Sequence, residues 1–556
     1  MANADVPSYL TTATPNPMSN RAPWFKNTAQ SYAGIFFWIA FFDQLGGNVT
    51  GPGALGMTNL GIALLALVCA GALSVVLFYA VPGLLGMKTG LPLYIVGTST
   101  FGTHGGYFLP GIFMGLLQIG WYSVGTFYAA KFILEGIGQE AHAVSIFGPE
   151  GQFDVIFIIA AVIWGYVFAF LGAKGIAYVA RVATFLPLVI IIMLLASALA
   201  GSDTLAKLDR GESAKAALAA SNVLETEAKE AEAAAKAEGQ TDIEAEQAGA
   251  EAKKALAKQP ANPDEIEAVS LDDSGKAMVS GMQLAGFLLV IQMVIGFFAT
   301  AGAVGADFCM NNRDAKDVWM GGIVGVGVAA LVAGGLALIT IAGAHGQLLG
   351  NVGQQSVTWG DLADYSYGGG LKIVSPTMGN VMKILFAIGS MAPACFCSFI
   401  IGNSLSTMLG SEKTRVPLTL GGATIGIVLA ALGVAGNLAP FFGLIGASFG
   451  PVIGAMIADY LLSGGKWAGP RRGISVPGYV AWVLGFIVGI LNHDWIGALP
   501  GWHPTSIYAL VVGFVVYFVL AKAGMEGEAV DLPNLKLAAA AAPGDTAAVS
   551  EAPPAE

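Results

Sequence analysis

Long apolar stretches alternate with short polar loops along most of the chain. Each stretch is close to or above the roughly 18 to 20 residues that a helix needs to cross a bilayer, and their repetition excludes a single membrane anchor. The pattern therefore predicts an all-α polytopic membrane protein with about twelve transmembrane helices. We expect these helices at about residues 31–50, 59–84, 108–134, 153–172, 177–200, 279–303, 318–343, 379–408, 417–435, 438–463, 475–492 and 503–523.

Lys and Arg residues gather in every second loop, whereas the opposite short loops contain almost none near the helix ends. Cytoplasmic loops of membrane proteins carry this excess of basic residues. The alternation predicts an even number of spans, both termini in the cytoplasm, and a multi-pass protein of the plasma (inner) membrane. The basic residues that precede the first span or follow an even-numbered one are Arg21, Lys26, Lys88, Lys174, Arg181, Arg313, Lys316, Lys413, Arg415, Lys466, Arg471, Arg472 and Lys522.

The composition agrees with a lipid environment. Of the 556 residues, 55% are hydrophobic and only 11% are charged, and the mean hydropathy is +0.68, which is outside the range of soluble globular domains. The net charge of −11 gives no sign of a nucleic-acid partner. The four cysteines have no metal-ligand spacing, and no catalytic motif is present, so we expect neither a metal site nor an enzyme.

Composition changes divide the chain into five parts. We expect a cytoplasmic N-terminal segment without a cleaved signal at 1–30, transmembrane helices 1–5 at 31–201, and an extracytoplasmic insert at 202–276. Transmembrane helices 6–12 follow at 277–524, and a disordered cytoplasmic tail at 525–556.

The insert is rich in Ala, Glu and Lys, which are strong helix formers. We expect a helical hairpin that turns near Gly239 and ends at Pro260 and Pro263. Because the insert has few Leu, Ile or Val residues, it cannot build its own core, and a solvated appendage is the simpler interpretation. The alternative is a docking element for a protein partner that the sequence does not identify.

The first span ends in the sequence FFDQLGGNVTGPG. Its carboxylate and amide, Asp43 and Gln44, are followed by glycines and a proline that can break a helix and release backbone groups into a cavity, as in discontinuous transporter helices. Asp43 and Gln44 are therefore candidates for ion and substrate binding. The alternative is that Asp43 is solvated at the outer end of a shorter span.

The third and sixth spans contain candidate ring-binding residues. In LLQIGWYSVG, Gln118 and Trp121 are three residues apart and share a helix face. The indole can stack on a flat ring while the amide bonds the ring's edge. In the sixth span, Phe298 lies among small residues and is a candidate for a second aromatic wall against the substrate ring. The alternative for all three residues is ordinary helix packing.

The eighth span offers side-chain oxygens at Ser398 and Asn403. Such oxygens suit a hard cation such as Na+. The alternative is that the hydroxyl bonds the backbone of its own helix, which is common for serine in membrane helices.

Four stretches together resemble the nucleobase:cation symporter family, which includes cytosine permease and the hydantoin and allantoin carriers. They are GMKTGLPLYIVGTSTFG, LLQIGWYSVG, FFATAGAVGADFCMNNRDAK and FFGLIGASFGPVIGAMIADYLL. The resemblance implies a LeuT-type fold, with two inverted five-helix repeats followed by two extra helices. It also implies that Trp121 stacks on the substrate, that Gln118 contacts the ring's polar edge, and that Phe298 completes the sandwich.

The sequence departs from the family at the coupling-ion site. Sodium-coupled members use first-span carbonyls and two adjacent eighth-span hydroxyls, whereas this chain reads Ser398-Phe399 and lacks one hydroxyl. The coupling ion is therefore left open between Na+, with Ser398 as a ligand, and H+, with Asp43 as the titrating group.

These observations predict a cation-coupled symporter that imports a nucleobase or a related planar heterocycle, such as cytosine, a purine, hydantoin or allantoin. The substrate-binding candidates are Trp121, Gln118, Phe298 and Gln44, and we expect no cofactor other than the coupling ion. Two alternatives remain: a transporter of another small solute, such as a vitamin-like ring or an amino-acid derivative, and a non-transporting membrane sensor that uses the external insert.

Overall fold

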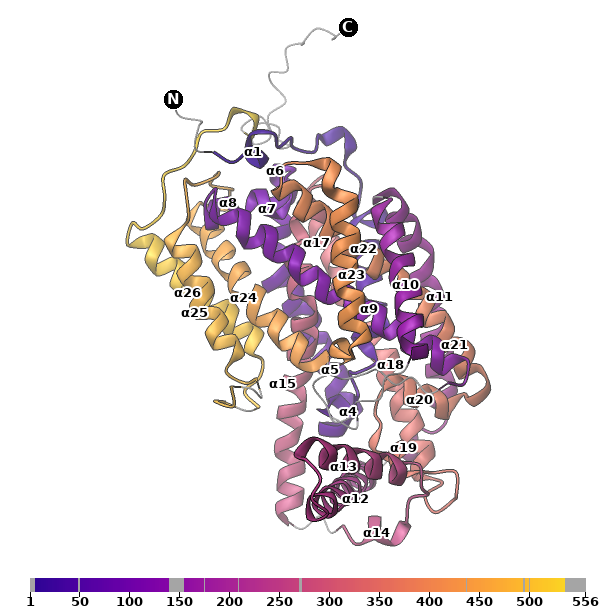
Figure 1. Cartoon of the computed structure of the whole chain (residues 1–556). Coiled ribbons are helices and arrows are strands. Elements are labelled where there is room, and N and C mark those ends of the chain that lie inside the picture. Colours follow the sequence, from indigo (N-terminus) through magenta and orange to yellow (C-terminus); the bar gives the residue numbers. More distant parts are fainter. Residues whose placement is uncertain are drawn as a thin grey trace.

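The protein is a bundle of long helices with a helical hairpin at one end (Figure 1). The computed structural model describes residues 6–48, 51–139, 155–174, 176–208, 210–269, 273–436, 438–493, 496–499 and 501–535. Within these ranges, eight helices are long and apolar enough to cross a membrane, and three shorter apolar helices accompany them. The chain is a multi-pass α-helical membrane protein.

Each predicted span corresponds to an apolar helix, except that the first is a pair of short helices. The first segment comprises α2 (Thr28–Phe36) and α3 (Ile39–Phe42). The other spans of the first half are α5 with η3 and α6 (Leu60–Leu73, Ser74–Tyr79, Ala80–Thr89), η4 with α9 (Tyr107–Ile112, Phe113–Gly136), α10 (Val155–Ala173) and α11 (Ile176–Ser202). Those of the second half are α15 (Asp273–Ala303), α17 with η6 and α18 (Ala315–Gly322, Ile323–Val328, Ala329–Leu349), α21 with α22 (Pro376–Gly389, Met391–Met408), α23 (Arg415–Ala431), α24 (Leu438–Leu462), α25 (Val476–Ile490) and α26 (Thr505–Lys522).

Short elements connect these helices. They are α1 (Ser8–Thr11), η1 (Met18–Asn20), η2 (Trp24–Lys26), β1 (Gly47–Asn48), β2 (Gly51–Pro52), α4 (Ala54–Met57), α7 (Leu93–Val96), α8 (Thr98–Phe101), η5 (Leu205–Lys207), α14 (Pro263–Glu267), α16 (Gly305–Cys309), α19 (Trp359–Ala363), α20 (Tyr367–Val374), η7 (Glu412–Thr414) and η8 (Val434–Gly436). Strands β1 and β2 pair as an antiparallel hairpin directly after the first span.

The first span is interrupted earlier than its glycines predict. Helix α2 ends at Phe36, and Trp38 has extended backbone angles (φ −84°, ψ 129°) before α3 begins at Ile39. The GG and GPG segments form the β1–β2 hairpin beyond the helix rather than the interruption itself. The interruption lies among aromatic residues without a glycine or proline, so local sequence gives no signal for it.

Small residues allow the membrane helices to approach closely. Gly201 of α11 meets Gly343 of α18, and Gly71 of α5 meets Gly327 of η6; a β-carbon at Gly201, Gly343 or Gly71 would touch the facing backbone. Interfaces of this kind are typical of membrane bundles, where dispersion contacts replace the hydrophobic effect as the source of association.

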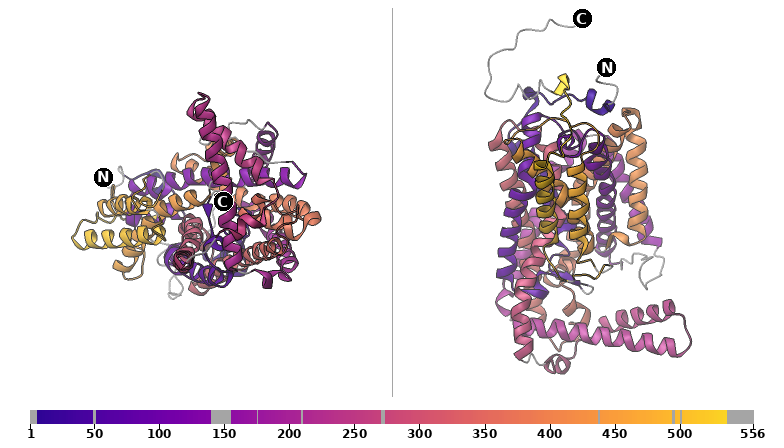
Figure 2. Two further views of the ribbon diagram at one scale, coloured as in Figure 1. Left: turned by 90° about the horizontal axis from the view of Figure 1, so that it is seen from below. Right: turned by 90° about the vertical axis from the view of Figure 1, so that its left-hand side faces the viewer.

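The insert is a two-helix hairpin formed by α12 (Arg210–Ala237) and α13 (Asp242–Ala257). Gly239 provides the left-handed turn (φ 84°), and Thr241 and Glu244 form a capping box at the start of α13. The hairpin extends sideways at the end of the bundle opposite α1 (Figures 1 and 2).

The insert is not solvated along its whole length. The first half of α12 packs against the loop between α18 and α20, where Trp359 of α19 is buried. Two backbone hydrogen bonds join the same parts, from Ala261 N–H to the Val357 carbonyl (2.9 Å) and from Trp359 N–H to the Gln259 carbonyl (3.2 Å). The membrane bundle thus supplies the apolar partners that the insert lacks.

Candidate functional site

Trp121 lies at the centre of a cluster of aromatic side chains in the middle of the bundle. Its ring stacks on Phe442 of α24 (centroids 5.6 Å apart, 28° between planes) and meets the edges of Phe297 and Phe441, both at 5.1 Å. Its indole N–H donates to the Thr300 hydroxyl on α15 at 3.0 Å. The ring plane of Trp121 is therefore fixed by packing and by one hydrogen bond.

Trp38, at the interruption of the first span, belongs to the same cluster. Its ring centroid is 5.7 Å from that of Trp121 and 6.1 Å from that of Phe297. Gly125 of α9 provides the space, since a β-carbon there would be 3.1 Å from the Trp38 ring. Its indole nitrogen is buried and has no hydrogen-bond partner among the described residues. Sequence reasoning missed Trp38, although an aromatic residue deep inside a span was a usable signal.

Gln118 lies one turn before Trp121 on α9 and is also buried. Its amide nitrogen faces the Met114 sulfur at 3.5 Å, which is a weak contact. The structure therefore brings together two of the predicted substrate residues, on one helix face, next to the interrupted first span.

Phe298 lies outside this cluster. It stacks on Phe36 (5.6 Å, 19°) and contacts Tyr32, whereas its neighbour Phe297 faces Trp121. Successive residues of a helix point about 100° apart. The aromatic wall that α15 contributes next to Trp121 is Phe297.

Asp43 and Gln44 lie at the end of α3, away from the aromatic cluster. Asp43 is fully buried and accepts hydrogen bonds from the Gln44 side chain and from the Gly368 N–H at the start of α20, each at 2.9 Å. The Asp43 carboxylate also lies 3.7 Å from the Lys131 ammonium group. Lys131 is ten residues after Trp121 on α9, a rise of about 15 Å.

The Asp43–Lys131 pair is part of a chain of charges that joins three spans. Lys131 lies 4.0 Å from Glu135 on the same helix, and Glu135 forms a 2.8 Å ion pair with Lys383 of α21. Lys383 is almost fully buried. The alternative of a solvated Asp43 does not fit this environment, because Asp43 is neutralised by a lysine and fixed by the α20 backbone.

Ser398 directs its hydroxyl to backbone oxygens. It donates to the Cys395 carbonyl of its own helix at 2.9 Å and lies 3.4 Å from the Phe168 carbonyl of α10. This is the arrangement that the packing alternative describes. Its use as a cation ligand stays a prediction.

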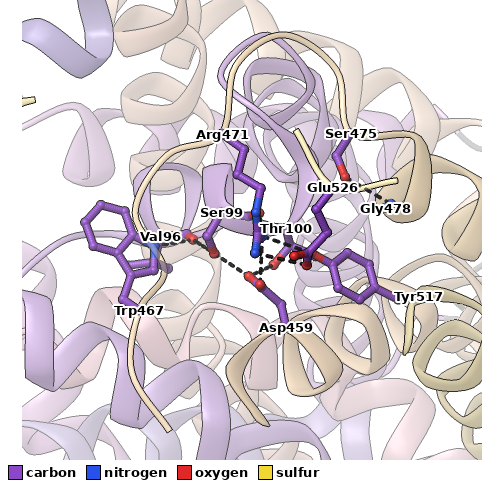
Figure 3. A network of polar contacts seen from close by, with 10 residues as sticks. All are labelled: Val96, Ser99, Thr100, Asp459, Trp467, Arg471, Ser475, Gly478, Tyr517 and Glu526. Carbon is purple, nitrogen blue, oxygen red and sulfur yellow. Dashed lines mark hydrogen bonds and ion pairs between the residues drawn. The ribbon is translucent and has the colours of Figure 1, made fainter. Parts of the chain in front are cut away.

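A second buried polar network lies at the end of the bundle that carries α1 (Figure 3). Arg471 forms ion pairs with Asp459 of α24 (2.7 Å) and with Glu526 (3.0 Å), and it donates to the Tyr517 hydroxyl of α26 (3.0 Å). Asp459 also accepts hydrogen bonds from Ser99 and Thr100 of α8. The sequence shows an acidic residue near the end of a span followed by basic residues, but not which residues pair.

Part of the segment predicted as a tail is included in this network. The Arg472 N–H donates to the Glu528 carbonyl, and the Val530 N–H donates to the Pro470 carbonyl at 2.7 Å. The rest of the predicted tail, 536–556, lies outside the described residues.

The chain matches no protein-family model and no curated protein sequence. Its structure is similar to that of Mhp1, a nucleobase-cation-symport-1 family transporter, in a closed conformation with bromovinylhydantoin bound; the TM-score is 0.56 at 14% identity, over 96% of this chain and 97% of that one. The structure of Mhp1 in its inward-facing conformation is also similar, with a TM-score of 0.55 at 13% identity. The match covers 95% of this chain and 98% of that one. These likenesses confirm the predicted LeuT-type fold.

Proposed function

We propose that the chain is a cation-coupled secondary transporter that imports a nucleobase or a related planar heterocycle. The observation that carries the proposal is the aromatic cluster around Trp121, located where the first span is interrupted. The fold shared with Mhp1, which has been captured with a hydantoin compound bound, supports it.

The cluster suits a flat ring on physical grounds. Aromatic faces stack with gains beyond those of simple burial, and a residue held in advance loses little freedom on binding. Trp121 is held in this way by Thr300. Gln118, on the same helix face, supplies an amide for the polar edge of the substrate.

The coupling ion is Na+ or H+. For Na+, the carbonyl groups freed where α2 ends, together with Ser398, are the ligands we propose. For H+, Asp43 is the titrating group, and its contacts with Lys131 of α9 and Gly368 of α20 connect its charge to two other elements. An ion drives transport only if it binds one conformation better than the other.

We also propose the orientation in the membrane. The insert and α1 are at opposite ends of the bundle (Figure 1). Taken with the excess of Lys and Arg in alternate loops, this arrangement supports cytoplasmic termini and an insert on the outside.

The proposal is tested by uptake of radiolabelled ring compounds into proteoliposomes, with Trp121→Ala as the variant. We expect uptake to fall to background. Trp319→Ala is the matched control, because Trp319 is exposed on the outside of the bundle, and it should transport normally. Full uptake by Trp121→Ala contradicts the proposal.

Ligand-induced thermal stabilisation of the purified protein identifies the substrate and ion together. The compounds are nucleobases, hydantoins and unrelated amino acids, each with and without Na+. A ring compound that stabilises more strongly in Na+ supports sodium coupling, whereas stabilisation indifferent to Na+ but dependent on pH supports proton coupling. No response to any ring compound overturns the substrate class.

A further inference from the structure

The Trp38 indole nitrogen differs from those of three other tryptophans in the protein. The indole N–H groups of Trp121, Trp467 and Trp482 each donate to an oxygen, at 3.0, 2.9 and 3.1 Å. The Trp38 N–H is buried without an acceptor among the described residues. Buried donors are nearly always paired in folded proteins, so an unpaired one requires an explanation.

The aromatic and small residues that pack beside the Trp38 ring supply no acceptor to this donor. Its ring neighbours are Trp121 and Phe297, and Gly125 and Ala394 lie between the helices beside it. Aromatic and aliphatic groups exclude water and give a neighbouring polar group a low dielectric, in which a hydrogen bond to a ligand is strong and an unmade one is unfavourable.

We propose that Trp38 selects substrates by donating its indole N–H to an acceptor on the edge of the bound ring. This inference rests on the proposed function and narrows its substrate class. The substrate is a planar heterocycle with an unprotonated ring nitrogen on the edge that faces the first span.

The two tryptophans then have different roles. The Trp121 N–H is already bonded to Thr300, so this residue contributes its ring face and does not distinguish one edge from another. Trp38 contributes a donor that rejects rings without a matching acceptor, because such a ring leaves the N–H unpaired in a dry site. Its position at the helix interruption places this donor on a segment whose backbone is not constrained by helical geometry.

The experiment follows the logic of a double-mutant cycle. The donor on the protein and the acceptor on the ligand are removed separately and then together, and the four binding affinities are compared. The probes are purine with 1-, 3- and 7-deazapurine, and cytosine with 3-deazacytosine, each pair differing by a single ring nitrogen. Binding to the unaltered protein and to Trp38→Phe is measured by titration calorimetry. Phenylalanine keeps an aromatic ring and removes the N–H.

We expect one analogue to bind the unaltered protein about ten-fold more weakly than its parent, as loss of one buried hydrogen bond predicts. Trp38→Phe should weaken the parent by a similar factor and leave that analogue unchanged. Equal weakening of parent and analogue by Trp38→Phe overturns the inference and indicates that a water molecule is the usual acceptor.

The unaltered protein alone also tests the inference, in case the variant does not fold. If every analogue that lacks one acceptor binds as tightly as its parent, the inference is wrong. If no ring compound binds the unaltered protein at all, the proposed function fails and this inference fails with it. Ring binding that is lost in Trp121→Ala but keeps its full preference for the parent compound in Trp38→Phe removes only the inference.

Discussion

Trp121 of α9 donates its indole N–H to the hydroxyl of Thr300 on α15 at 3.0 Å. The two residues are 179 positions apart in sequence, and both are buried. This bond joins the third span to the sixth within the aromatic cluster, and together with the stacked ring of Phe442 it fixes the orientation of the indole.

Thr300→Val should therefore both destabilise the protein and weaken ring binding. Valine keeps the branched shape but leaves the Trp121 N–H buried and unpaired, which costs about 1–3 kcal/mol. Thermal unfolding and ligand titration measure the two effects. Thr126→Val is the matched control, since the Thr126 hydroxyl is equally buried but bonds only its own helix, at the Tyr122 carbonyl. Ring binding by Thr300→Val equal to that of the control would show that the bond does not position Trp121.

Lys131→Met should be strongly destabilising. The substitution leaves the buried Asp43 carboxylate without the ammonium group at 3.7 Å, and removing one member of a buried ion pair costs about 3–5 kcal/mol. Because Lys131 is a quarter exposed, we expect the lower end of this range. Denaturation in detergent measures the loss.

The double variant Lys131→Met with Asp43→Asn tests the same pair without an unpaired charge. We expect it to recover much of the stability lost in Lys131→Met alone, because the charge that lacked a partner is gone. Additive losses from the two substitutions would mean that the two groups do not interact.

Trp359→Ala should loosen the insert from the bundle. Trp359 is buried between α12 and the loop before α20, and truncating a buried aromatic side chain costs about 3–5 kcal/mol. Limited proteolysis of the insert reports the change as faster cleavage. Ala233→Glu on the exposed side of α12 is the control and should leave cleavage unchanged. Equal protection of Trp359→Ala and the unaltered protein would contradict the observed packing.

Arg471→Met should destabilise far more than Arg472→Met. Arg471 is buried and is the ion-pair partner of Asp459, so its loss leaves that carboxylate uncompensated, at about 3–5 kcal/mol. The Arg472 side chain is exposed, and exposed charges contribute about 0–1 kcal/mol. Thermal midpoints of the two variants make the comparison, and similar values would contradict it.

The positions of the spans follow from the sequence because the length of an apolar run is a local property. The interruption at Trp38 could not be predicted in this way. It contains no glycine or proline, and Trp38 is held there by the ring of Trp121 in a distant part of the chain. Local sequence pointed instead to the glycines that form the β1–β2 hairpin.

The arrangement of the candidate site residues could be predicted from the sequence only in part, for a related reason. Gln118 and Trp121 share a face of one helix, and their spacing alone establishes it. The choice between Phe297 and Phe298 depends on which side of α15 meets α9 and α24, and the surrounding alanines and glycines give no amphipathic pattern to decide it. The partners of Asp43 are likewise supplied by α9 and α20, far along the chain.

The side chain of Asn534 donates to the carbonyl oxygens of Leu10 and Ala13, both at 3.0 Å. Leu10 and Ala13 leave the ribosome long before Asn534, and every described span lies between them in the sequence. This contact can therefore form only after every span has been synthesised. A chain that stops before Asn534 lacks both hydrogen bonds, so the contact with Leu10 and Ala13 marks a molecule that has been translated through that residue.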